Sequence, residues 1–131
     1  MSALTVTREE YCEDWLACYT LEWTSAADGT LSAAVPQIQG TIERIVFKPS
    51  SDAGETPFNL YDVTLLDRDG IDILSGAGAN LSNTSVSDVL VTDLTPVLPI
   101  ATIGLLTLNV AHADSGGAGT HSGTIRIFLR R

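Results

Sequence analysis

Apolar and polar residues alternate along much of the chain, which is the pattern of strands that are buried on one face. This two-residue period recurs in segments 19–23, 61–65, 104–113 and 125–129. The β-branched segment 41–48 is also typical of a strand, and it ends at a proline. Because longer helical periods are rare, we expect an all-β fold of about seven or eight short strands, arranged as an antiparallel β-sandwich or jelly roll.

Turn residues separate these segments and predict hairpins between them. Ala27-Asp28-Gly29 is expected to close one hairpin, and Asp69-Gly70 a second one. The Gly-rich segment 114–119 predicts a long hairpin loop before the last strand. Segments 50–57 and 76–85 lack apolar periodicity, so we expect polar loops there.

The N-terminal segment is compatible with a different local structure. Thr7-Arg8-Glu9-Glu10 has the form of a capping box, and Tyr11, Trp15 and Tyr19 recur at four-residue spacing. A short helix of about two turns would fit this pattern, although the clean alternation after Tyr19 opposes it. Residues 1–15 are therefore expected to form either a short helix or an N-terminal arm on a single β domain that spans residues 1–131.

Charge and hydropathy exclude several classes of partner. The chain has 16 acidic and 7 basic residues, a formal net charge of −9, so we expect no nucleic-acid binding. The most apolar stretch, residues 97–110, is too short for a membrane-spanning helix and contains Pro99 and Gly104, so we expect no membrane partner. No basic segment precedes an apolar one near the N-terminus, so no signal peptide is expected.

Residues that bind metals are few and poorly spaced. Cys12 and Cys18 match neither a zinc pair nor a redox motif, and we expect both to be reduced thiols. His112 and His121 flank the Gly-rich loop, but Asp114 is the only further ligand type nearby, so they are expected to be surface residues without a metal.

The acidic segment 67–72 fits an EF-hand poorly and is expected to be a β-turn, in which Asp69 accepts a hydrogen bond from its own backbone. Asp67 and Asp72 are expected to be solvated at the strand ends. A hydrolase would need Ser75 or Ser115 beside a histidine, and neither serine lies in a nucleophile motif. We therefore expect no enzymatic activity and no cofactor.

Several motifs together resemble a family of small virion structural proteins of tailed bacteriophages. In that family a tryptophan strand is followed by a Pro-x-x-x-Tyr-Asp-x-Thr-Leu hairpin and an Asp-Gly-x-Asp turn. The matching segments are distributed along most of this chain, and they are residues 23–29, 40–42, 57–65, 69–74, 76–80, 106–108 and 123–125. The segment from Tyr11 to Tyr19 departs from the family pattern.

The resemblance implies a virion-associated β-protein, and most members are catalogued only as hypothetical phage proteins. We expect a head decoration or cement protein that binds the major capsid protein and stabilises the shell. It would assemble in the bacterial cytoplasm as a homo-oligomer, with a trimer favoured, and reside on the capsid surface. The alternative in the same class is a head-to-tail connector, stopper or tail-associated ring protein.

Contacts with other virion proteins are expected from loops 50–57 and 75–85 and from the N-terminal arm. A separate hypothesis is a carbohydrate-binding attachment module in which the rings of Trp15 and Trp23 stack on sugars, although burial is the favoured position for these rings. The candidate interaction residues are Trp15, Trp23, Asp52, Glu55, Asn80, Ser82 and Asn83.

Overall fold

The computed structural model describes residues 2–11, 16–35, 40–52, 54–90, 100–102, 106–114 and 120–130. Within these residues all regular structure is β and every strand pair is antiparallel, as the alternation predicts. The described part therefore contains no helix that is long and apolar enough to cross a membrane. The strands are β1 (Ala3–Tyr11), β2 (Leu16–Thr24), β3 (Leu31–Val35), β4 (Gly40–Pro49), β5 (Asp62–Leu66), β6 (Ser87–Leu90), β7 (Ile100–Thr102), β8 (Leu106–Ala111) and β9 (Ser122–Arg130).

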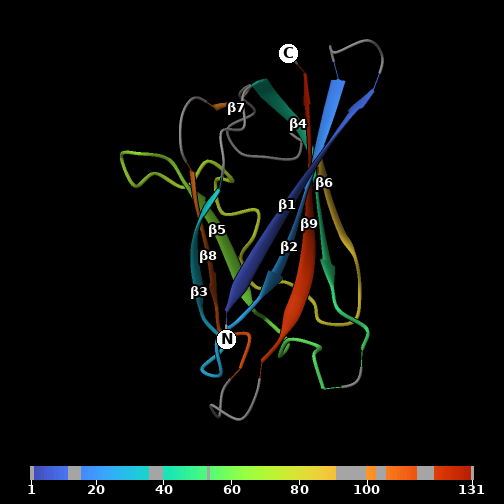
Figure 1. Ribbon diagram of the computed structural model, residues 1–131, viewed down its shortest axis with the longest axis vertical. Coiled ribbons are helices and arrows are strands. Elements are labelled where there is room, and N and C mark those ends of the chain that lie inside the picture. Colours follow the sequence, from blue (N-terminus) through green and yellow to red (C-terminus); the bar gives the residue numbers. More distant parts are fainter. Residues whose placement is uncertain are drawn as a thin grey trace.

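The strands form two sheets that pack face to face (Figure 1). The first sheet has the order β1-β2-β9-β4-β6, and β7 also pairs with β4. The second sheet has the order β3-β8-β5. The core between them is made by inward side chains from both sheets, including Leu21, Phe47, Leu65, Leu108 and Ile127. This confirms the predicted β-sandwich, whereas the jelly roll stays a prediction.

Two of the predicted hairpins are wrong, because the strands on either side of the turn belong to different sheets. Residues 25–30 lead from β2 in the first sheet to β3 in the second, and residues 112–121 lead from β8 back to β9. Turn residues specify where the chain reverses. They do not specify which strand the returning segment joins, because burial of the inner faces decides the pairing.

The predicted N-terminal helix is also wrong. Residues 3–11 form β1, which pairs with β2 from Ala3 opposite Thr24 to Tyr11 opposite Leu16. Leu4 and Val6 pack against the core, and pairing along nine residues provides more hydrogen bonds than an isolated helix of two turns would. The segment is thus an edge strand of the first sheet, while Trp15 and Cys12 lie outside the described residues.

The turn predicted at Asp69-Gly70 is confirmed, but two carboxylates have a different role from the one expected. Asp67 and Asp72 are not simply solvated, because both accept backbone hydrogen bonds. Asp67 Oδ1 accepts from Asp69 at 2.9 Å and Ile71 at 3.0 Å. The carboxylate of Asp72 accepts at 3.1 Å from three N–H groups, those of Leu65, Leu74 and Gly76.

Residues 72–81 cover the outer edge of β5 without forming a regular strand. The Val63 N–H donates to the Gly78 carbonyl at 2.7 Å, and the Leu81 N–H donates to the Tyr61 carbonyl at 2.8 Å. A side chain at Gly78 would collide with the Val63 carbonyl, so this close approach requires glycine. The β5 edge is therefore shielded, whereas the outer edge of β1 has no partner strand among the described residues.

Candidate functional site

Four connecting segments meet at one end of the sandwich, at the bottom of the view in Figure 1. Backbone hydrogen bonds join them: Ser25 N–H to the His121 carbonyl at 2.7 Å, Phe58 N–H to the Ala113 carbonyl at 2.9 Å, and Ser122 N–H to the Glu55 carbonyl at 2.8 Å. We call this surface the loop end, and it comprises the described residues of segments 25–30, 50–61, 81–86 and 112–121.

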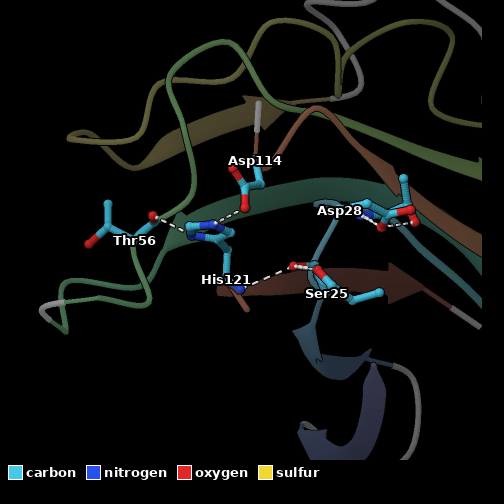
Figure 2. Close-up of polar contacts among 7 residues, drawn as sticks. Ser25, Asp28, Thr56, Asp114 and His121 are labelled. Atoms are coloured by element: carbon cyan, nitrogen blue, oxygen red, sulfur yellow. Dashed lines mark hydrogen bonds and ion pairs between the residues drawn. The ribbon is translucent and has the colours of Figure 1, made fainter. Parts of the chain in front are cut away.

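His121 is buried at the centre of the loop end, which corrects the expectation that it is a surface residue. Its Nδ1 lies 2.9 Å from the Thr56 carbonyl oxygen, and its Nε2 lies 3.3 Å from Oδ2 of buried Asp114 (Figure 2). Its backbone N–H donates to the Ser25 hydroxyl at 3.0 Å. His121 therefore contacts two of the other segments that make this surface, 25–30 and 50–61, and also the start of its own segment at Asp114.

These contacts do not form the serine–histidine pair that a hydrolase needs. The Ser25 hydroxyl donates to the Ala26 carbonyl at 2.9 Å and accepts from the backbone of His121, so it does not bind the imidazole. In the described part of the chain, no serine hydroxyl is hydrogen-bonded to a histidine ring. Ser115 lies outside that part.

A second polar cluster surrounds Asp62. Its Oδ2 lies 2.6 Å from Nδ1 of exposed His112, and its Oδ1 accepts from the Asn80 N–H at 2.8 Å. Partial burial alone would raise the pKa of Asp62, but the hydrogen bonds from Asn80 and His112 and the charge of the imidazole outweigh it and lower this pKa below its ordinary value.

The backbone around Asp62 has an unusual conformation. Leu60, Asn80 and His112 have φ angles of +67°, +53° and +61°, in the left-handed region that residues other than glycine rarely adopt. Such strain persists only where surrounding contacts enforce it, and it is common at binding sites. Here the contacts to Asp62 and the hydrogen bond from the Leu60 N–H to the Leu81 carbonyl (2.9 Å) enforce it.

The loop end also exposes large apolar side chains. Phe58, Leu60 and Val86 are exposed, and the rings of Phe58 and His121 form a T-shaped pair with centroids 5.5 Å apart. Sequence patterning missed these three residues because they lie in segments without apolar periodicity. Isolated apolar residues within a polar loop were the available signal.

Two hollows lie side by side at this end, separated by residues 48–51, which line both. The first has a volume of about 360 Å³, and its lining includes Asp52, Glu55, Glu22 and Lys48. The second has a volume of about 400 Å³, and its lining includes Thr56, Asn83 and Val86. The predicted contact loops 50–57 and 75–85 therefore meet at the second hollow.

The candidate interaction residues have different positions. Asp52 and Glu55 line the first hollow and Asn83 the second. The Ser82 hydroxyl accepts at 3.2 Å from the Thr84 and Ser85 N–H groups and so shapes its loop, while Asn80 lies beside Asp62.

Trp23 is only 1% exposed and packs against Tyr61 with ring centroids 5.8 Å apart. Its ring is therefore not available for stacking on a sugar, and the favoured expectation that this ring is buried is confirmed. Burial also raises the pKa of Tyr61 to about 12. Trp15, the other ring of the sugar-binding hypothesis, lies outside the described residues.

Neither metal-ligand geometry nor similarity to known proteins assigns a function to the loop end. Among the described residues, no group of three or more His, Cys, Asp or Glu side chains is arranged to hold a metal ion. No protein-family model matches the chain, and no curated protein matches it.

Proposed function

We propose that the chain is a non-enzymatic structural protein of a tailed-phage virion, and that it acts as a head decoration or cement protein on the capsid surface. The loop end would bind the major capsid protein and thereby stabilise the shell. The observation that carries the proposal is that residues of both expected contact loops line the second hollow at the loop end, where Val86 in that lining and the nearby loop residues Phe58 and Leu60 are exposed. Apolar anchors next to concave surface are typical of protein interfaces.

The conformation of the loop end supports a docking role. Leu60 is held in a left-handed conformation, and its side chain remains 55% exposed. Binding a rigid loop costs less conformational entropy than binding a flexible one. The contacts around Asp62 would therefore help the loop end to bind without a large ordering cost.

The charges at the loop end indicate the kind of surface it would meet. Asp28, Asp52 and Glu55 are exposed there. Three of the seven basic residues, Arg44, Arg126 and Arg130, lie elsewhere along β4 and β9, whereas Lys48 on β4 lines both hollows. We therefore propose that the capsid partner presents basic side chains around an apolar contact.

We further propose that copies of the chain associate with each other through β1, in a trimer. The outer edge of β1 is nine residues long, and its inner side chains Leu4 and Val6 are only partly buried. An unpaired strand edge readily accepts another strand or segment. In a closed trimer this edge would face a different surface of the next copy.

A binding experiment with matched variants tests the docking site. Capsids assembled without this protein would be mixed with the wild type, Leu60→Asp or Ile71→Asp, and co-sedimentation would be measured. Ile71 is 62% exposed on the turn at the other end of β5, so it is a matched control. We expect a loss of at least about tenfold in affinity for Leu60→Asp and none for Ile71→Asp. Equal binding of both variants would reject the loop end as the docking surface.

The copy number in purified particles tests the position of the protein. Hundreds of copies would support shell decoration, because decoration proteins follow the capsid lattice. A count on the order of six or twelve would instead indicate a neck or tail ring.

A further inference from the structure

We infer that His121 and Asp114 share one proton, and that this shared proton acts as a clasp that holds residues 54–57 in the loop end. Loss of the proton at higher pH would open the clasp. The inference deepens the proposed docking function and rests on it for its biological meaning.

The contacts of the His121 ring determine which of its nitrogens carries a hydrogen. The Thr56 carbonyl oxygen can only accept, so Nδ1 of His121 must carry a hydrogen for the 2.9 Å contact to be a hydrogen bond. In a neutral imidazole Nε2 is then an acceptor. Nε2 nevertheless faces Oδ2 of Asp114 at 3.3 Å, and an ionised carboxylate is also an acceptor.

Both contacts are therefore favourable only when a further proton lies between Nε2 and Asp114. It can be carried as an imidazolium beside a carboxylate or as a carboxylic acid beside a neutral ring, and either form makes a hydrogen bond. Without that proton, two acceptors face each other among buried groups, where repulsion is poorly screened.

Acidic groups of the described residues lie near the clasp. Asp28 lies close enough to Asp114 to interact electrostatically, and hydrogen bonds from Thr30 lower the pKa of Asp28, which keeps it ionised. The Glu55 carboxylate is on the clasped segment itself, and Phe58 contributes an uncharged ring that lies 5.5 Å from the His121 ring between centroids. His112, the other histidine, is bound to Asp62.

Opening the clasp would free the segment that carries a proposed contact residue. Thr56 is attached to His121 through its carbonyl, and the neighbouring Glu55 carbonyl accepts from the Ser122 N–H at 2.8 Å. A repelled imidazole would loosen both attachments. The wall of the first hollow that Glu55 forms would then lose its fixed position.

The experiment uses the fact that the chain has only two histidines. Nuclear magnetic resonance of the ring nitrogens would follow His121 and His112 separately from about pH 5 to 9. Hydrogen exchange of the Ser122 amide, corrected for the intrinsic rate, would report docking of residues 54–57 in the same samples.

We expect the protection of the Ser122 amide to fall by at least about tenfold as the shared proton is lost. Asp114→Asn should remove this dependence, because an amide N–H can donate to neutral Nε2 without an additional proton. His112→Gln is the control and should behave like the wild type. Wild-type protection that is unchanged when the His121 ring titrates would overturn the inference, and so would a ring that stays neutral throughout beside an ionised Asp114.

These measurements need no capsid, so they fail or succeed separately from the docking proposal. If the clasp titrates as expected but the loop end does not bind capsids, only the proposed function is rejected. The wild-type titration alone decides the clasp if Asp114→Asn does not fold.

Discussion

Gly123 on β9 lies directly opposite Trp23 on β2, and the indole occupies the space that a side chain at Gly123 would need. A Cβ atom at this position would lie 2.8 Å from Cζ2 of Trp23. The buried ring cannot withdraw easily, because it also packs against Tyr61. The Trp23 ring can therefore lie over β9 at this point only because residue 123 has no side chain.

Gly123→Ala is expected to destabilise the protein by about 1–3 kcal/mol, because it overpacks a buried site. The free energy of unfolding would be measured by denaturant titration. Thr5→Ala on the exposed face of β1 is the control and should change stability by less than about 0.5 kcal/mol. A change that small for Gly123→Ala would show that Trp23 can move aside.

Asp62→Ala is expected to destabilise the protein by about 1 kcal/mol at neutral pH, because it removes the acceptor for Asn80 and the partner of His112. The folded-state pKa of Asp62 is lowered, so its contribution is present above the unfolded-state pKa and is lost as the pH falls through the folded-state value. The stability difference between wild type and variant should thus shrink as the pH falls below about 4. A difference that grows as the pH falls below about 4 would contradict the assignment.

Tyr61 should make the protein sensitive to alkali. Burial raises its pKa to about 12, whereas a tyrosine in the unfolded chain titrates near 10. Its contribution to stability is therefore complete below about pH 10 and is lost as the pH rises toward 12. Denaturant titrations at several alkaline pH values should show a smaller decline for Tyr61→Phe than for the wild type, and identical declines would be evidence against burial of the hydroxyl.

Asp72→Ala is expected to cost about 2 kcal/mol, because three backbone N–H groups lose their acceptor. Asp69→Ala in the same turn is the matched control, since the backbone N–H of Asp69 rather than its carboxylate takes part in the turn. Thermal unfolding of both variants provides the comparison. Similar melting temperatures would mean that solvent replaces the Asp72 carboxylate without cost.

Local alternation predicted the strands well but could not assign them to sheets. The segments predicted at 41–48, 61–65 and 125–129 are the cores of β4, β5 and β9, because the side-chain period of a strand depends only on its own residues. The turn at Ala27-Asp28-Gly29 reverses the chain whether β3 pairs with β2 or joins the other sheet. Which sheet receives β3 depends on packing between residues far apart in the sequence.

The N-terminal error has a specific cause. The four-residue spacing of Tyr11, Trp15 and Tyr19 fits one face of a helix, but an even spacing also fits one face of a strand. The sequence contains a signal for the burial of His121. This residue lies two positions before Gly123, so it continues the alternation of inward positions along β9, which includes Gly123 and Ile125. Its contacts with Thr56 and Asp114 were not accessible, since they depend on the crossover between sheets.

The irregular cover on β5 also has a consequence for association between copies of the chain. β8 pairs with one edge of β5, and residues 72–81 bond to the other edge. A strand of another molecule therefore cannot extend the second sheet at β5 unless it first displaces this segment.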